Sequence, residues 1–215
     1  MKPLFEKYRP TTLGEVIGQP KAVAQVQRLI AAGGLAGRAY WIAGASGTGK
    51  TTIARCMAET IADEFDTEEL DAGDCTVSRL QEIERLTSFK GMSGKGGRAV
   101  IVNEAHGLRK DAIRQLLVML ERIPSHTAWI FTTTTAAEAT LFEDCVDAGP
   151  LLSRCLPIDL TNQGLANLFA ERAREIAQAE GLDGKPIAAY VKLVQKCRNN
   201  FRAVLCEIEA GKMIE

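Results

Sequence analysis

The sequence of 215 residues is long enough for one domain of ordinary size and a small appended domain. Apolar residues make up 46% of it and charged residues 25%, so a packed core is expected and disorder throughout the chain is excluded. The formal net charge of −1 excludes a protein that coats nucleic acid through bulk positive charge. A local basic patch remains compatible with this charge.

The cysteines show no metal-binding or redox pattern. None of the six forms a C-x-x-C pair, and neither His106 nor His126 has a cysteine at the spacing of metal ligands. We therefore expect reduced, mostly buried cysteines in a cytoplasmic protein. The charged first ten residues lack the apolar run of a signal peptide, and no stretch approaches the roughly 18 apolar residues of a membrane helix. No contact with a membrane is expected.

Hydrophobic periodicity predicts alternating helices and strands in the first three quarters of the chain. The first clear element is a helix over about 19–34, which Gly33 and Gly34 end. The elements that follow in chain order are a strand over 38–44, a helix over about 50–63, a weak strand over 68–73, a helix over 76–89, a strand over 98–105, a helix over 109–124, a strand over 128–135 and a short strand over 156–160.

Beyond Thr161 the pattern changes to helices alone, over roughly 162–180, 186–197 and 199–211. Strands that alternate with helices predict an α/β fold with a mostly parallel sheet covered by helices on both faces. Because the helical tail cannot extend that sheet, it predicts a small all-helical lid. The expected domains are an α/β domain over 1–160 and the lid domain over 161–215.

The segment GASGTGKT, Gly44 to Thr51, matches the phosphate-binding motif G-x-x-x-x-G-K-[ST] and lies between a predicted strand and a predicted helix. Its glycines let backbone N–H groups point at phosphate oxygens, at a helix N-terminus whose dipole favours an anion. Lys50 is expected to neutralise the β- and γ-phosphates, and the Thr51 hydroxyl to bind Mg²⁺. The residues expected to bind the nucleotide are Gly44, Ala45, Ser46, Gly47, Thr48, Gly49, Lys50, Thr51 and Thr52.

The strand over 98–105 ends in a pair of residues, Asn103 and Glu104, where nucleotide hydrolases of one large class carry two adjacent carboxylates. In a parallel sheet this strand end lies beside the phosphate-binding loop, because ligands gather at the carboxyl ends of the strands. Glu104 is therefore expected to be the general base that polarises the attacking water; a solvated strand-end acid is the alternative. Asn103 is an amide, and it is expected to share the metal with Thr51.

Four segments together resemble the AAA+ clamp-loader ATPases, and the nearest likeness is to their small, replication-factor-type subunits. These segments are FEKYRPTTLGEVIGQ (5–19), the phosphate-binding loop, VNEAHGLRKDAIRQLLVMLE (102–121) and PLLSRC (150–155). The resemblance runs in order from about residue 4 to residue 210. It implies a P-loop AAA+ fold, ATP or ADP with Mg²⁺ as the ligand, and a ring of AAA+ subunits that closes on a sliding clamp and primed DNA.

The resemblance also assigns roles to residues outside the loop. The residues that it places around the adenine are Tyr8, Arg9, Pro10, Val16, Ile17 and Gly18. Thr134 matches the polar sensor that positions the water, Arg154 the arginine finger that acts on a neighbour's ATP, and Arg202 the lid arginine that reads the γ-phosphate. Alternatives stay open, since Arg9 and Arg154 can be surface charges, Thr134 a strand-end hydroxyl, and Arg202 a side chain lying over its own domain.

The sequence departs from this family in two ways: Asn103 stands where the family has an aspartate, and no counterpart of the family's C-terminal helical collar is found within the 215 residues. The amide removes a negative charge near Mg²⁺, so we expect a slow ATPase, and we expect Asn103→Asp to speed hydrolysis. The alternatives are another AAA+ DNA-remodelling ATPase, such as a branch-migration motor or helicase loader, and a nucleotide-binding scaffold subunit that does not hydrolyse ATP.

Basic residues near the strand end suggest where DNA would bind. Arg109, Lys110 and Arg114 open the helix that follows Glu104, and these residues are expected to grip the phosphates of primer–template DNA without reading bases. A second basic group, formed by Lys90, Lys95 and Arg98, surrounds the segment GMSGKGG. An ordinary solvated helix face is the alternative for the first group.

Overall fold

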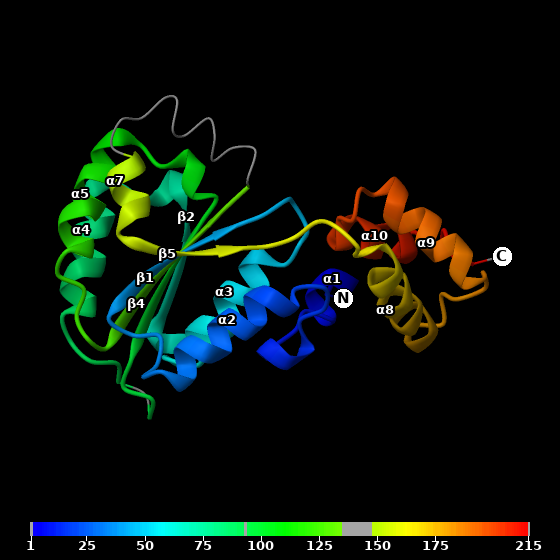
Figure 1. Ribbon diagram of the computed structural model, residues 1–215, viewed down its shortest axis with the longest axis horizontal. Helices are drawn as coiled ribbons and strands as arrows, with labels where there is room; N and C mark the ends of the chain where they lie inside the picture. Colours follow the sequence, from blue (N-terminus) through cyan, green and yellow to red (C-terminus); the bar gives the residue numbers. More distant parts are fainter. Residues whose placement is uncertain (1, 93, 135–147, 215) are drawn as a thin grey trace.

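The computed structural model describes residues 2–92, 94–134 and 148–214 (Figure 1). Within these residues, five parallel strands form one sheet in the order β2-β3-β4-β1-β5. The strands are β1 (Arg38–Ala43), β2 (Thr67–Asp71), β3 (Arg98–Asn103), β4 (Thr127–Thr133) and β5 (Cys155–Asp159).

Helices connect the strands and follow them. Before and within the sheet these are α1 (Leu4–Lys7), α2 (Pro20–Ala31), α3 (Lys50–Glu59), α4 (Val77–Thr87), α5 (Lys110–Leu120) and α7 (Ala148–Ser153). Single turns of 3₁₀ helix lie at Leu13–Glu15, Glu64–Asp66, Ala72–Asp74 and Ala105–Gly107. The last three helices are α8 (Ala166–Ala179), α9 (Ile187–Lys196) and α10 (Phe201–Glu209).

Alternating side chains of the strands build a separate core on each face of the sheet. On one face the ring of Trp41 of β1 lies 5.7 Å from that of Phe131 of β4 in a tilted arrangement, and both pack with apolar residues of α4, α5 and α7. On the other face Tyr40 and Ile42 pack with residues of α2 and α3. Figure 1 shows the two helical layers on either side of the sheet. The predicted α/β fold, with helices on both faces and a helical lid after it, is confirmed.

The lid helices α8, α9 and α10 enclose a third core of their own. Leu4 from the N-terminal segment is buried in it, and Phe5 and Tyr8 pack against it. Lys7 Nζ also donates to Glu180 Oε1, at the end of α8, over 2.6 Å. Figure 1 shows the N-terminal α1 beside the lid helices. The first residues of the chain therefore pack with the lid, and the division at residue 160 stays a prediction.

The cysteines in the described part of the chain are free thiols. Burial raises the pKa of Cys56 to about 11 and the pKa of Cys75 and Cys155 to about 12, which makes these three thiols unreactive. Cys206 is the exposed one among the described cysteines, and three of them are buried, as expected for most of the set. Cys145 lies outside the described residues. None of the described helices is long and apolar enough to span a membrane.

Candidate nucleotide-binding site

The phosphate-binding loop connects β1 to the first residue of α3, Lys50. Gly47 and Gly49 have φ values of 76° and 100°, in the left-handed region that glycine adopts without a steric penalty. These two positions let the loop turn tightly, so that α3 begins at its rim. The loop therefore ends at a helix N-terminus, where backbone N–H groups and the helix dipole favour a phosphate.

Lys50 is folded back onto this loop. Its side chain is buried, with 7% of the residue exposed, and Nζ donates to the carbonyl oxygens of Gly44 and Ala45 over 3.0 Å each. Burial lowers the pKa of Lys50, and the nearby charge of Arg202 adds to this, while Glu104 opposes it. An anion in the loop would stabilise the charged form of Lys50, which is the electrostatic condition for binding phosphate.

A pocket lies where the loop, the N-terminal segment and the lid meet. Most of the predicted site residues form its wall: Tyr8, Arg9, Pro10, Val16, Ile17, Ser46, Gly47, Thr48, Gly49, Lys50, Thr51, Thr52, Glu104 and Arg202. Gly44 and Ala45 lie behind the wall, where their carbonyls hold Lys50. Gly18 also lies outside the wall, because it packs against the lid: a Cβ on it would lie 2.6 Å from Leu165 Cδ2.

Sequence reasoning missed six residues of this wall: Phe5, Glu15, Phe169, Arg172, Phe201 and Leu205. Four of them come from the lid helices: Phe169 and Arg172 are three residues apart in α8, and Phe201 and Leu205 are four residues apart in α10. Such spacings place side chains on one helix face. The sequence shows this spacing, but a helix face that lines a pocket and one that packs in the lid core have the same pattern of apolar residues. The ring of Phe201 lies 4.9 Å from that of Phe169, so these two residues close the lid side of the pocket.

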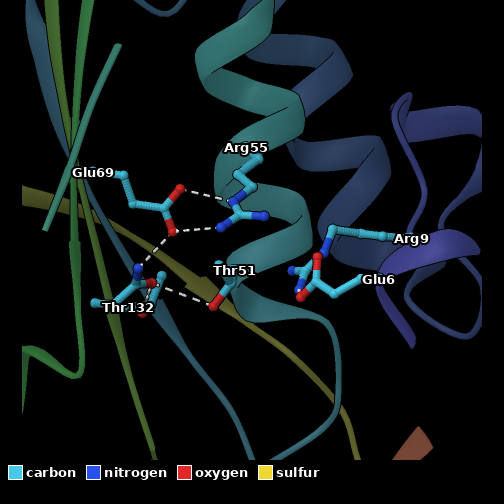
Figure 2. A network of polar contacts seen from close by, with 7 residues as sticks. Glu6, Arg9, Thr51, Arg55, Glu69 and Thr132 are labelled. Carbon is cyan, nitrogen blue, oxygen red and sulfur yellow. Dashed lines mark hydrogen bonds and ion pairs between the residues drawn. The ribbon is translucent and has the colours of Figure 1, made fainter. Parts of the chain in front are cut away.

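Arg9 is held at the pocket by Glu6, and the two side chains point at one another in Figure 2. The hydrogen bond from Arg9 lowers the pKa of the Glu6 carboxyl. Arg9 Nε is buried, and it has no hydrogen-bond partner among the residues that the structure describes. A buried donor without an acceptor is costly, so a ligand that supplies an acceptor here would stabilise the site. A ring nitrogen of adenine is such an acceptor.

The lid contacts the loop directly, and Arg202 lies beside this contact in the pocket wall. The Arg202 guanidinium carbon lies 5.5 Å from the centre of the Phe5 ring, and both residues line the pocket. The backbone N–H of Phe201 donates to the Gly47 carbonyl over 3.4 Å. A Cβ on Gly47 would lie 2.1 Å from Asn200 Oδ1, so only glycine fits between loop and lid at this position.

Asn103, at the end of β3, is the centre of a hydrogen-bond network with Thr51, Thr132 and Glu69, which Figure 2 labels. Its Oδ1 accepts from Thr51 Oγ1 over 3.3 Å and from Thr132 Oγ1 over 3.0 Å. Its Nδ2 donates to Glu69 Oε1 on β2 over 2.8 Å. Arg55 of α3 holds the Glu69 carboxylate with two bonds, of 2.7 and 3.1 Å. The structure thus brings together the two residues expected to hold the metal, Thr51 and Asn103.

Glu104 follows Asn103 in a strained backbone conformation, with φ 51° and ψ 45°. Such a conformation is uncommon for a residue other than glycine, and it is found most often at functional sites. The Glu104 carboxylate lines the pocket, and its Oε2 lies 3.4 Å from His106 Nδ1. His106 Nδ1 also lies 3.3 Å from Thr133 Oγ1 on β4. His106 therefore connects the predicted base to the neighbouring strand end, and this contact was not anticipated from the sequence.

The threonines at the end of β4 divide their contacts. Thr132 bonds to Asn103 and Thr133 contacts His106, whereas Thr134 lies just after the strand and its carbonyl accepts from Thr133 Oγ1 over 3.5 Å. The sensor role of Thr134 stays a prediction. The two threonines before it make the side-chain contacts: Thr132 with Asn103, and Thr133 with His106.

Arg154 lies between α7 and β5, and it is not a wall residue of the pocket. Its Nη2 pairs with Glu121 Oε1 over 2.5 Å, and its Nη1 donates to the Pro150 carbonyl over 2.9 Å. This placement leaves Arg154 no contact with the site of its own chain among the described residues. Its role as an arginine finger stays a prediction.

The predicted DNA-binding residues are exposed at the start of α5. Arg109 is the residue before the helix and lies 3.9 Å from Asp111, and Lys110 and Arg114 are exposed on the helix. Two members of the second basic group are engaged within the chain. Lys95 Nζ donates to the Glu59 carbonyl over 2.6 Å, and Arg98 Nε donates to the Phe89 carbonyl over 2.8 Å. DNA contact by either group stays a prediction.

The chain has the α/β fold of P-loop AAA+ proteins, followed by a helical lid. The sequence profile of the TIP49 P-loop domain matches residues 7–92. RuvB of Thermotoga maritima, described as a Holliday junction branch migration motor, superposes with a TM-score of 0.67 over 94% of this chain and 64% of that chain, at 21% identity. This likeness shows the fold.

The more particular likeness is to replication factor C. Small subunit 1 of Pyrobaculum arsenaticum is 30% identical over 83% of this chain and 53% of its own length. The small subunit of Methanosphaera stadtmanae is 28% identical over 99% of this chain and 64% of its own length, and subunit 3 of Saccharomyces cerevisiae is 28% identical over 81% and 52%. The resemblance to AAA+ clamp-loader subunits is thus confirmed. The chain spans about half the length of the first of these relatives.

Proposed function

We propose that this chain is an ATP-binding AAA+ subunit that hydrolyses ATP slowly with Mg²⁺ and works in a clamp-loader-like assembly in the cytoplasm. The observation that carries the proposal is the pocket in which Lys50, Arg202 and Glu104 converge from the loop, the lid and the strand end. Lys50 and Arg202 are cations that would stabilise the charge of a triphosphate, and Glu104 is an acid that would accept the proton of an attacking water. The likeness to replication factor C small subunits supports the clamp-loading part.

The residues present fit a nucleotide with its metal ion. The buried Lys50 and the unpartnered Arg9 Nε are donors that a nucleotide would satisfy. No group of three His, Cys, Asp or Glu side chains that could hold a metal ion occurs in the described part of the chain. A Mg²⁺ ion would therefore be held by Thr51, Asn103 and the phosphates, which is the usual arrangement for this ion. It would supply positive charge against the phosphate oxygens.

Asn103 makes the reaction slow but does not abolish it. Two unit charges about 4 Å apart interact by up to about 4 kcal/mol near a protein surface. Solvation reduces the loss from replacing a carboxylate with an amide to about 1–3 kcal/mol, which is about a 10- to 100-fold slower reaction. Glu104 remains to accept the proton of the water, and Lys50 remains to hold the phosphates.

Neighbouring subunits complete the site in this proposal. Arg154 is anchored by Glu121 and the Pro150 carbonyl just before β5. In the assembly it would act on the ATP of a neighbouring subunit. Arg202 acts in the same chain. Primer–template DNA would contact Arg109, Lys110 and Arg114 through its phosphates.

A protein partner such as a sliding clamp requires an exposed apolar surface. Three exposed apolar side chains flank the ion pair of Asp66 and Arg98: Phe65, Phe89 and Met92, which are 98%, 72% and 95% exposed. The Met92 N–H donates to Asp66 Oδ1 over 3.1 Å and Arg98 Nε to the Phe89 carbonyl, so the group is held as one surface. Replacing Phe89 and Met92 with serine should abolish stimulation of ATP hydrolysis by the clamp, while ATP binding stays unchanged.

Two alternatives rest on particular observations. The likeness of fold to RuvB favours another DNA-remodelling ATPase, such as a branch-migration motor. The amide at Asn103 favours a scaffold that binds ATP without hydrolysing it. Stimulation by a sliding clamp with primed DNA supports the proposal, stimulation by junction DNA alone supports the first alternative, and binding without any hydrolysis supports the second.

The test begins with binding. Calorimetry should show uptake of ATP by the parent protein and binding about 10- to 100-fold weaker by Lys50→Ala, while the exposed-lysine control Lys21→Ala keeps the parent affinity. The mass of the protein should then be measured with and without an ATP analogue and primed DNA, because an arginine finger requires assembly. Equal affinity of parent and Lys50→Ala, or no uptake by either, would exclude the proposal.

A further inference from the structure

The carboxylate of Glu69 lies against the residue that replaces the metal-binding aspartate. Strands β2 and β3 are paired in parallel with Asp71 opposite Asn103, so Glu69 lies two residues earlier on β2. Its Oε1 nevertheless reaches Asn103 Nδ2 over 2.8 Å. Arg55 fixes both oxygens of Glu69 from the helix that begins at the phosphate-binding loop, as Figure 2 shows.

This contact determines which edge of the Asn103 amide faces Thr51. An ionised carboxylate only accepts hydrogen bonds, so the edge of Asn103 that meets Glu69 must be the NH₂ group. The amide oxygen then faces Thr51 and Thr132, from whose hydroxyls it accepts bonds of 3.3 and 3.0 Å. An amide turned by half a rotation would present two N–H groups to Thr51, and these would repel a cation. An aspartate has no such choice, because both of its oxygens can accept.

We propose that Glu69 is a positioning residue for Asn103: held by Arg55, its carboxylate keeps the amide oxygen turned toward Thr51, and so preserves a metal-facing acceptor where the aspartate is absent. This inference rests on the proposed function, since it concerns the Mg²⁺ that accompanies the nucleotide. It explains how an amide can serve at a position where a full charge is usual. Arg55 contributes by offsetting the charge of Glu69.

The same contact changes what is expected of Asn103→Asp. The sequence alone predicts that restoring the aspartate speeds hydrolysis. In the structure the new carboxylate would lie at the distance that now separates Asn103 Nδ2 from Glu69 Oε1, 2.8 Å. Two carboxylates this close repel each other. The gain from Asn103→Asp should therefore be small in the parent, and it should be larger when Glu69 is replaced by glutamine.

The experiment measures how much Mg²⁺ adds to nucleotide affinity. A fluorescent ATP analogue is titrated into the full chain with Mg²⁺ and with EDTA, and the ratio of the two dissociation constants is the magnesium contribution. A glutamine can turn either its oxygen or its NH₂ group toward Asn103, so it no longer fixes which edge of that amide faces Thr51. Glu69→Gln should therefore lower this contribution by about 3- to 10-fold, with the affinity in EDTA unchanged. The matched control is Glu68→Gln, the adjacent β2 glutamate, which pairs with Arg79 instead and should change neither value.

A cycle with Asn103→Ala tests whether Glu69 acts through Asn103. In the Asn103→Ala background, Glu69→Gln should produce no further loss of the magnesium contribution. Asn103→Asp should raise that contribution more in the Glu69→Gln background than in the parent. Thermal unfolding without nucleotide shows whether each variant is folded.

The outcomes separate the inference from the proposed function. If the parent binds no ATP, or binds it equally with Lys50→Ala, the proposed function fails. If the parent binds Mg·ATP but Glu69→Gln leaves the magnesium contribution unchanged, or lowers it equally when Asn103 is alanine, Glu69 is not a positioning residue. A loss of affinity by the same factor in Mg²⁺ and in EDTA would show a general structural effect and would also overturn the inference.

Discussion

The phosphate-binding loop and the end of strand β3 lie side by side, but they depend on different chemistry. The loop offers backbone N–H groups and one lysine, and its shape is set by Gly47 and Gly49. The strand end offers side chains. Because Asn103 carries an NH₂ group, it donates a hydrogen bond to Glu69, which joins the same network. Backbone sites therefore follow from a motif, whereas side-chain sites depend on neighbours that no motif names.

The largest expected effect separates reaction from binding at the strand end. Glu104→Gln removes the proposed general base and should slow single-turnover hydrolysis by about 100- to 10,000-fold. ATP affinity should stay within a factor of about two, because the loop that holds the phosphates is unchanged. Rapid-quench measurement of bound ATP gives the rate.

The control for this variant is Glu171→Gln, which replaces an exposed acid on α8. The control protein should hydrolyse ATP at the parent rate. If Glu104→Gln also hydrolyses at the parent rate, Glu104 is only a solvated acid at a strand end. The strained backbone of Glu104 would then need another explanation.

The next effect belongs to the loop. Lys50→Met removes a charge-assisted bond to phosphate and should weaken ATP binding by about 10- to 100-fold. Without nucleotide the same variant should unfold at a higher temperature, because burial lowers the pKa of Lys50 and its charge therefore costs free energy in the folded state.

The pH dependence of stability tests this cost. Since the pKa of Lys50 is lower in the folded state, the unfolded chain binds more protons between the folded and unfolded values. The penalty is therefore fully present below the lowered pKa of Lys50, and it is lost as the pH rises from that lowered pKa toward its ordinary value. The difference in unfolding temperature between Lys50→Met and the parent should shrink over that range; a constant difference would contradict this account.

Much of this comparison could be read from the sequence. The alternation of strands and helices predicted the sheet and lid, because buried parallel strands and amphipathic helices have distinct periods. The loop followed from a motif whose spacing is fixed by geometry. Glu69 and His106 could not be found in the same way: Glu69 lies on a strand that had only a weak signal, and its contact with Asn103 depends on which strands are neighbours. The pocket wall supplied by the lid depends on how two helical surfaces meet, which periodicity does not encode.

A smaller effect tests how the lid touches the loop. Gly47→Ala and Gly49→Ala both place a side chain in a left-handed conformation, which costs about 1–2 kcal/mol of stability. Only at Gly47 does the new Cβ meet the lid, at 2.1 Å from Asn200 Oδ1; at Gly49 no atom lies within 4 Å. Chemical denaturation should therefore show a further loss of about 1–3 kcal/mol for Gly47→Ala. Equal losses would mean that the lid does not press on the loop in solution.

The smallest expected effect concerns DNA, which would meet the surface just beyond the strand end. Arg109 and Lys110 are exposed at the start of α5, where the helix N-terminus adds to their positive charge. If each contacts one phosphate, the double alanine variant should lower the slope of log affinity against log salt by about two. The matched control replaces two other exposed lysines, Lys21 and Lys192, so the net charge changes equally. An equal change of slope in the control would show that DNA senses total charge, and the strand end would then have no part in placing it.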